Sequence, residues 1–433
     1  MRCGVPALFA WSSLLLALFL LPFPAGAAKP LTLDEALKVA EAPHPDLELA
    51  RADLELAAAD YQAAGSRRDL SVTLEGGLRR TLPALRTPNS DYISDNSIRL
   101  NARKNLYDFG RTGSAEEAAR SVIEAREQHL IDARDRRRID IMQRFFDVLV
   151  ADLQYTMDNE YMAVAYVHFD QMRDRYGQNL ISKVDLTEQE ARFQEWLVKR
   201  NLSEKRQRLT RALLASTMNQ PQDLPSELAD PALPGNSRKI PDYEALLPLM
   251  LDNNPRLKAQ QRLLEASRQR MESLRADKMP TLDAELEAAD YSQRRLGRDE
   301  QRAGLILTWP IYQGGRVSAQ LAREQAQFHR QQAEAERLKR ELSQALLAAW
   351  MDAEQLQKTV RNAARVEADF RDLRLERARA QYDVELKTNL GDSMAGTMEA
   401  RLKQRNAEYQ LALALAKLEA LLGKPLPEQP ARK

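Results

Sequence analysis

Hydrophobic side chains follow two different periods along this chain, and each period predicts a different kind of element. In residues 111–176 and 316–382 the apolar positions recur every three or four residues, with Arg, Gln and Glu between them. This spacing indicates long helices with a narrow apolar stripe, which suits coiled-coil packing with the other faces in water. Residues 89–220 and 311–424 contain no proline, so neither segment holds the residue that breaks helix interiors most strongly.

Each long helix is expected to turn and run back along itself. Gly177 is a natural stop for the first helix, and the sequence from Ser182 to Asp185 has the form of a capping box that starts a return helix. The second hairpin repeats this plan with a turn at residues 385–388. On the helices alone, a solvated coiled-coil rod remains an alternative.

Four shorter segments alternate between apolar and polar side chains, which is the period of a β-strand. They cover about residues 71–80, 97–106, 281–290 and 302–311. Each has about the 9–11 residues that a membrane-spanning strand needs, and an apolar outside with a polar inside is typical of a barrel with a wet lumen. Because a membrane barrel needs about eight strands, several chains would have to pool theirs. A soluble sheet of two hairpins is the alternative.

The chain repeats one structural plan. Three residues before the first long helix recur in the same order 205 positions later: Tyr107, Gly110 and Arg111, then Tyr312, Gly315 and Arg316. We expect both sets to form strand-to-helix junctions, where glycine permits the sharp turn. Self-similarity at this spacing indicates one unit built twice, each copy pairing a helical hairpin with two strands.

The N-terminal residues 1–27 have the pattern of a secretory signal peptide, with Arg2 ahead of a short apolar run and small residues at its end. A retained N-terminal anchor is the alternative. Cys3, the one cysteine, precedes the apolar run and is badly placed to carry a lipid. The expected division is residues 1–27 as signal peptide, 28–218 as first repeat, 219–241 as Pro-rich linker, 242–424 as second repeat and 425–433 as C-terminal tail.

Composition narrows the function classes. Lys and Arg number 64 against 63 Asp and Glu, so the net charge of +1 creates no global field that would attract nucleic acid. With 29% charged residues and a mean hydropathy of -0.54, long solvated helices are favoured over a thick core. Beyond the N-terminus no segment has the length of a membrane helix without charges, so any part in a membrane must consist of strands. The four histidines form no i, i+4 pair, and we expect no catalytic, cofactor or metal site.

Taken together, these motifs resemble those of the TolC-like outer membrane efflux protein family. The resemblance covers residues 31–423 and is most specific at the junctions 106–111 and 309–316, with support from residues 254–257. It implies a mainly α fold with a small β part, in which duplicated long hairpins form a periplasmic helical tube. Four strands per chain would join a 12-stranded transmembrane β-barrel in a homotrimer.

The resemblance also implies a function. The chain would be the outer membrane exit duct of a tripartite efflux or type I secretion system, surrounded by outer membrane lipid. Its partners would be a periplasmic adaptor (membrane fusion) protein and an inner membrane transporter, and it would catalyse no covalent chemistry. The transported substrate cannot be inferred, because selectivity in such systems lies largely in the inner membrane partner.

In this family the hairpin tips close the tube and meet the adaptor. Asp185 stands where the return helix of the family carries an acid, whereas Glu385 replaces a glycine that family members often have in the second tip. The implied aperture and adaptor-contact residues are Arg175, Tyr176, Gly177, Ser182, Asp185, Tyr382, Lys387 and Asp392. The alternative is that these are ordinary exposed helix residues whose charges contribute little.

Two other classes of function compete with the channel. One is a periplasmic coiled-coil structural protein without a pore, and the other is an adaptor subunit. An adaptor should have one helical hairpin flanked by soluble β-domains, whereas this chain has two hairpins and four strands of membrane length. A soluble monomer would defeat the channel interpretation.

Overall fold

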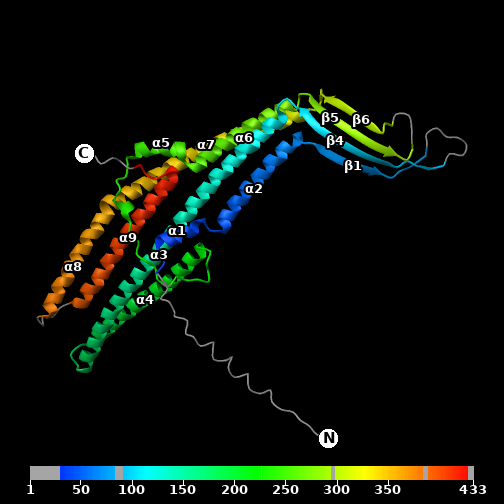
Figure 1. Ribbon diagram of the computed structural model, residues 1–433. Coiled ribbons are helices and arrows are strands. Elements are labelled where there is room, and N and C mark those ends of the chain that lie inside the picture. The colour runs from blue at the N-terminus through cyan, green and yellow to red at the C-terminus, as the bar shows by residue number, and fades with distance from the viewer. Residues whose placement is uncertain (1–29, 83–90, 226, 294–297, 384–388, 428–433) are drawn as a thin grey trace, which may run out of the picture.

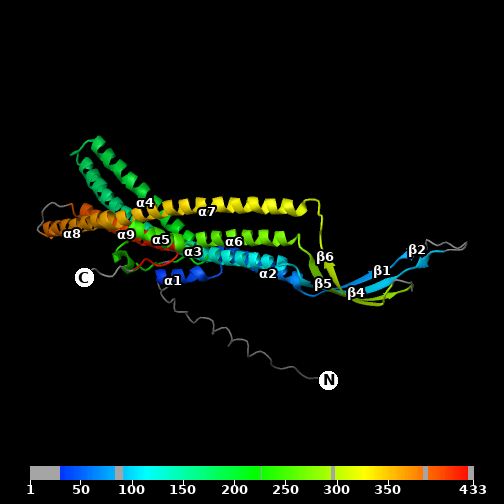
Figure 2. The same ribbon diagram turned by 90° about the horizontal axis from the view of Figure 1, so that it is seen from above.

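The computed structural model describes residues 30–82, 91–225, 227–293, 298–383 and 389–427. The expected signal peptide and Lys387 lie outside these ranges. In both orthogonal views the molecule is elongated, with a helical body at one end and a sheet at the other (Figures 1 and 2). Among the described helices, none combines the length and the apolar character that crossing a membrane requires.

The sheet contains four antiparallel strands in the order β1-β4-β5-β6, so the two repeats join through β4 and β5. The strands are β1 (Ser71–Gly77), β4 (Ser97–Tyr107), β5 (Thr281–Tyr291) and β6 (Gln301–Thr308). A short pair, β2 (Arg80–Thr81) and β3 (Ile93–Ser94), lies beyond β1 and β4.

Two of these strands are shorter than the alternating pattern predicts. β1 ends at Gly77, in the glycine pair at residues 76–77, and glycine weakens a strand. β6 ends at Thr308 rather than near residue 311, because Pro310 lacks the amide hydrogen that a further ladder bond would need. The apolar–polar alternation of the sequence continues past the end of β6, with Trp309 and Ile311 at its next two apolar positions.

The first repeat forms the hairpin expected from its sequence. Its helices are α1 (Leu33–Lys38), α2 (Pro45–Gly65), α3 (Arg111–Gly177) and α4 (Lys183–Thr217), with 3-10 turns at Val39–Glu41 and Ser66–Arg68. With 67 residues, α3 spans roughly 100 Å. It therefore runs from the sheet to the far end of the body, with α2 packed beside its first part and α4 beside its last part (Figure 1).

The second repeat follows the same plan with one difference. Its helices are α5 (Tyr243–Asn253), α6 (Pro255–Ala276), α7 (Arg316–Gln355), α8 (Arg361–Asp383) and α9 (Leu390–Leu422), preceded by a 3-10 turn at Pro234–Ser237. The sequence predicted one uninterrupted helix over residues 316–382. Instead, a π-helical turn at Leu356–Val360 separates α7 from α8.

The buried core lies in the middle of the helical body. One cluster packs α5 and α7 on α9, with fully buried side chains such as Met250, Leu346 and Leu418. A second packs α1, α3 and α4 on α9, where Phe146 stacks on Tyr409 with ring centroids 4.8 Å apart. The apolar stripes predicted on the long helices therefore meet at α9. This helix belongs to both clusters and holds the two repeats together.

Candidate functional site

One face of the sheet is apolar and exposed. Large hydrophobic side chains from all four strands lie on it and alternate with the charged residues of the other face: Val72, Leu74, Ile98, Leu100, Leu286, Leu305 and Leu307. Contiguous apolar surface of this kind is unfavourable in water. This face therefore requires an apolar surrounding.

The opposite face carries paired charges. Arg99 lies 3.0 Å from the carboxylate of Glu75. Arg103 and Asn105 both donate to Asp283, at 2.8 and 2.9 Å. Two further cross-strand pairs on this face are Asn101 with Glu285 and Arg302 with Glu287. Groups of opposite charge thus face each other across neighbouring strands, which stabilises a polar surface that borders water.

Both strand-to-helix junctions turn at a left-handed glycine, as the sequence predicted. Gly110 has a φ of 83° and Gly315 a φ of 79°, a region in which a side chain would be strained. Each glycine is the N-cap of a long helix, α3 or α7. The aromatic residues of the two junctions, Tyr107 and Tyr312, are exposed beside them.

The two junctions differ in charge. At the first, the buried Asp108 accepts a hydrogen bond from the amide of Thr112 at 2.9 Å and lies 3.5 Å from Arg68. Burial would raise the pKa of Asp108, but these two partners together lower it below its ordinary value. At the second junction Gln313 stands in the place of Asp108 and receives a bond from Arg316. The N-terminus of α3 thus has a carboxylate partner that α7 does not have in the equivalent position.

The first hairpin tip differs in one detail from the expectation. α3 includes Gly177, and the residue with positive φ is Asn179, at 56°. The amide of Leu180 then donates to the oxygen of Arg175 at 2.9 Å, which closes the turn. α3 therefore ends at Gly177, as the sequence predicted, while the left-handed conformation that closes the turn lies at Asn179. Asparagine serves there because it tolerates this conformation better than most side chains.

The expected capping box at the start of α4 is present. Ser182 Oγ accepts from the amide of Asp185 at 3.2 Å, and the Asp185 carboxylate accepts from the Ser182 amide at 3.1 Å and from its hydroxyl at 2.8 Å. Arg175 and Tyr176 lie at the adjoining end of α3 and are exposed. Five of the candidate tip residues thus lie together in the first tip.

The second tip contributes Tyr382 and Asp392, on either side of residues 384–388, which include Lys387 and lie outside the described ranges. Tyr382 is exposed near the end of α8, and Asp392 is half-buried in the first turn of α9. Both tips lie at the end of the body opposite the sheet, and they diverge from each other in the second view (Figures 1 and 2). Within a single chain the candidate residues therefore form two groups at one end.

A polar contact between the hairpins escaped the sequence analysis. The hydroxyl of Tyr161 on α3 donates to Glu399 on α9 at 2.9 Å, and the Tyr161 ring stacks on Trp196 of α4 at 4.5 Å. Lys403 then bridges Glu399 and Glu367, at 2.9 and 3.0 Å, and so reaches α8. Burial, and then the bond to Glu399, raise the pKa of Tyr161 to about 12. No spacing rule links residues 161 and 399, so this contact has no signal in the sequence.

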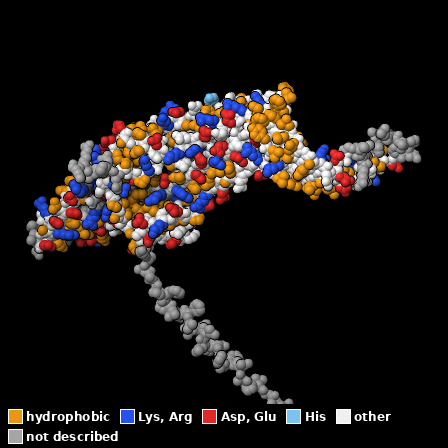
Figure 3. Space-filling view, turned by 45° about the horizontal axis from the view of Figure 1, so that its top comes forward, with side chains coloured by type: hydrophobic (Ala, Val, Ile, Leu, Met, Phe, Trp, Pro, Cys, Tyr) orange, Lys and Arg blue, Asp and Glu red, His pale blue; other side chains and the backbone are white. Residues whose placement is uncertain are grey.

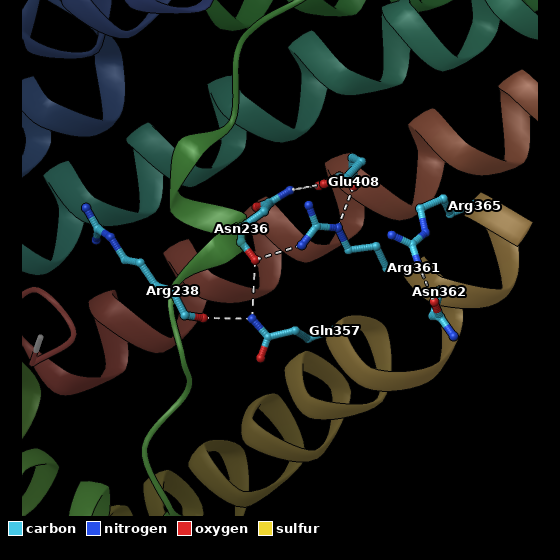
Figure 4. A network of polar contacts seen from close by, with 7 residues as sticks. All are labelled: Asn236, Arg238, Gln357, Arg361, Asn362, Arg365 and Glu408. Atoms are coloured by element: carbon cyan, nitrogen blue, oxygen red, sulfur yellow. Dashed lines mark hydrogen bonds and ion pairs between the residues drawn. The ribbon is translucent and has the colours of Figure 1, made fainter. Parts of the chain in front are cut away.

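The linker before α5 holds the π-helical turn. Figure 4 shows Gln357 of that turn donating to the backbone oxygens of Asn236 and Arg238, at 3.2 and 2.7 Å. Arg361, which follows the turn, donates to Glu408 of α9 at 2.6 Å and to the Asn236 oxygen at 3.2 Å. The Asn236 amide group also donates to Glu408, at 2.6 Å. These bonds join the linker, the π turn and α9. They therefore fix the point at which α8 extends from the helical body.

Among the described residues, no three His, Cys, Asp or Glu side chains are arranged to hold a metal ion. The arrangement that is present has an apolar outer surface, a polar inner surface and a long helical extension. Such an arrangement can line a water-filled path through an apolar layer.

Comparison with known proteins gives the family and the fold. A membrane protein from Pseudomonas aeruginosa aligns with a TM-score of 0.74 at 18% identity, covering 92% of each chain. The outer membrane protein VceC from Vibrio cholerae aligns at 0.72 and 19%, covering 91% of this chain and 97% of its own. The outer membrane channel CmeC from Campylobacter jejuni aligns at 0.73 and 16%, covering 92% and 87%. At these identities the structures establish a shared fold, and the mainly α fold with a small β part that the sequence predicted is confirmed.

None of the curated protein sequences compared with this chain matches it. The model of the outer membrane efflux protein family, in contrast, matches residues 36–215 and 246–424, which together make up most of the chain and fall one in each repeat. The chain therefore belongs to the outer membrane efflux protein family and serves as an exit duct of the outer membrane, with its helical body in the periplasm.

Proposed function

We propose that three copies of this chain assemble into one duct, with four strands from each closing a 12-stranded barrel in the outer membrane. The observation that carries this proposal is the sheet with one apolar and one charged face. Its outer strands, β1 and β6, each have one side without a partner strand among the described residues. A spanning sheet with open edges would leave backbone groups unsatisfied in lipid, so neighbouring copies must supply the pairing.

In this proposal the hairpin tips form the periplasmic aperture. Asp185 and Asp392 line the constriction and favour cations there, while bonds between neighbouring hairpins hold it shut. Arg175, Tyr176, Tyr382 and Lys387 take part in these bonds and in the contact with the adaptor. Support comes from the common location of both tips at the end farthest from the sheet.

The duct works without catalysis of its own. A periplasmic adaptor protein and an inner membrane transporter supply the cargo and the energy, in a tripartite efflux or a type I secretion system. The processed chain begins after a signal peptide of about residues 1–27, and its two repeats are residues 28–218 and 242–424, on either side of the linker. These assignments follow from the sequence pattern and from membership of the family.

Planar bilayer recording tests the duct and its aperture together. The wild-type protein, extracted in detergent as a complex of three chains, is expected to conduct with a preference for cations. Asp185→Asn together with Asp392→Asn should shift the reversal potential toward that of a non-selective pore, because the charges at the constriction are gone. Asp60→Asn, an exposed acid on α2 far from the tips, is the matched control.

The two parts of the proposal fail separately. A soluble monomer that does not conduct would overturn the duct. A conducting complex whose reversal potential is the same in the tip variant and in the control would place the selective constriction elsewhere.

A further inference from the structure

An open pocket of about 520 Å³ lies where β6 passes into α7. Residues 309–313 and 315–318 form most of its wall, and Lys278, from the turn before β5, completes it. Three of the lining side chains are large, apolar and strongly exposed: Trp309 at 63%, Ile311 at 90% and Tyr312 at 87%. Figure 3 shows hydrophobic side chains gathered where the helical body meets the strands. Such exposed apolar surface indicates an interaction site.

The pocket adjoins the apolar face of the sheet. Leu305 and Leu307 lie on that face, and Trp309 and Ile311 occupy the next two positions of the same alternation. The inference therefore rests on the proposed function, in which this face meets lipid. The helices extend into the periplasm from this level, so the pocket lies at the boundary between the membrane and the periplasm.

The same pocket carries two positive charges without a carboxylate in its wall. The Lys278 side chain is exposed and forms no hydrogen bond or ion pair with any described residue. Arg316 is bonded to the neutral side-chain oxygens of Gln313 and Gln320. The carboxylate of Asp277, next to Lys278 in the chain, lies instead 3.6 Å from an arginine of the other repeat.

The first junction differs, because its positive charges are paired with carboxylates of the same chain. Arg111, the counterpart of Arg316, pairs with Asp277, and Arg68 pairs with the buried Asp108. Cations at that junction are thus neutralised within the chain. At the second junction Lys278 and Arg316 have no carboxylate partner among the described residues, and they lie beside exposed aromatic and aliphatic side chains.

We propose that this pocket binds an anionic phospholipid of the periplasmic leaflet of the outer membrane. The ammonium of Lys278 and the guanidinium of Arg316 face the headgroup phosphate, and Trp309 and Ile311 lie against the upper parts of the acyl chains. Aromatic side chains favour this interfacial depth, and basic residues there attract anionic lipid. Charge complementarity selects a phospholipid over a purely apolar occupant.

Native mass spectrometry of the intact complex in an uncharged detergent tests the site, with phosphatidylglycerol as the added lipid. Lys278→Gln should weaken binding about fivefold, the effect of losing one basic residue near an anionic lipid. Lys205→Gln on α4 makes the same change at an exposed lysine of the periplasmic body and should have no effect. Since the Lys278 side chain has no partner among the described residues, its replacement should not disturb folding, which the mass of the complex verifies.

Three results would overturn the site. The first is equal phosphatidylglycerol binding by wild type and Lys278→Gln. The second is displacement of the lipid by inorganic phosphate at similar concentration, which would mean a site for soluble anions. The third is a photo-crosslinker at position 309 that labels a neighbouring chain instead of lipid. Loss of lipid binding with conductance intact supports the site and leaves the duct unaffected, whereas a monomer that does not conduct contradicts the proposed function itself.

Discussion

At the scale of single residues, close contact between the two hairpins depends on glycine. A Cβ atom added at Gly391 of α9 would lie 2.9 Å from Cγ2 of Val164 on α3. The two helices therefore approach each other more closely than any larger residue at position 391 permits. Gly396, one and a half turns further along α9, faces only the end of the Arg371 side chain, 3.1 Å from the added atom.

These two glycines should respond differently to alanine. Because the χ1 angle of valine is restricted in a helix, Gly391→Ala must push α9 away from α3, and we expect a loss of about 1–3 kcal/mol in stability. Gly396→Ala is expected to be neutral or to stabilise by up to about 1 kcal/mol, because Arg371 can move and alanine favours the helix. Thermal unfolding in detergent, followed by circular dichroism, measures both.

A second substitution tests the cause. Val164→Ala removes the clashing methyl groups and should restore most of the stability lost in Gly391→Ala. If the double variant remains as unstable as the single variant, close approach at this position does not explain the glycine. Glycine in a helix interior lowers helix propensity, and the sequence alone indicates no more than this for Gly391 and Gly396, since it cannot reveal which residue of another helix lies opposite.

At the scale of elements, α7 and α8 continue one another toward the second tip, but a π-helical turn interrupts the α-helical hydrogen bonds between them. The π-helical turn at Leu356–Val360 has five residues in which the backbone bonds are reorganised. Such turns are rare and often occur at functional sites. Here the turn bonds to the backbone oxygens of Asn236 and Arg238 in the linker, and the buried side chain of Asn236 ties the linker to Glu408 of α9. The linker is thus a structural brace for the second hairpin.

Removing the brace should loosen that hairpin. Asn236→Ala removes the side-chain bond that ties the linker to the half-buried Glu408 of α9, and we expect a cost of about 1–3 kcal/mol. Backbone amides of α8 should then exchange with deuterium faster than in the wild type, as measured by hydrogen–deuterium exchange. Asn362→Ala is the matched control, because Asn362 is exposed on α8 and its side chain bonds only Arg365 among the described residues (Figure 4). Equal protection of α8 in both variants would contradict the brace.

Elements differed in how well the sequence predicted them. Both long hairpins and all four strands follow from periodicity, because their apolar positions repeat many times. The π turn does not, since residues 356–360 contain ordinary helix formers and no proline or glycine. Its position depends on bonds to Asn236 and Arg238, more than a hundred residues away in the chain. Contacts of that kind have no local signature.

At the scale of the whole molecule, duplication explains how one sheet forms from two separate hairpins. β4 of the first repeat pairs with β5 of the second, and α9 packs against both hydrophobic clusters. The two repeats therefore act as one body, and the remaining open edges are β1 and β6. Cys3, the one cysteine, lies in the expected signal peptide, so introduced cysteines would be unique in the processed chain.

Cysteine pairs can determine whether these edges meet between chains. A double variant with Thr73→Cys or Ser71→Cys in β1 and Gly304→Cys or Ile306→Cys in β6 carries both thiols on the charged face. Within one chain β1 and β6 are separated by β4 and β5, whose spacing of about 4.8 Å per strand keeps such thiols too far apart to bond. If copies pair edge to edge, mild oxidation should link at least one combination into dimers and trimers. The closed ring should stop the ladder of cross-linked species at three chains.

Thr73→Cys with Asn101→Cys, opposite each other in neighbouring strands, is the control and should close only within the chain. A control that oxidises while every β1–β6 combination stays monomeric would rule out this closure, and a ladder that continues beyond three chains would mean an open assembly instead of a barrel.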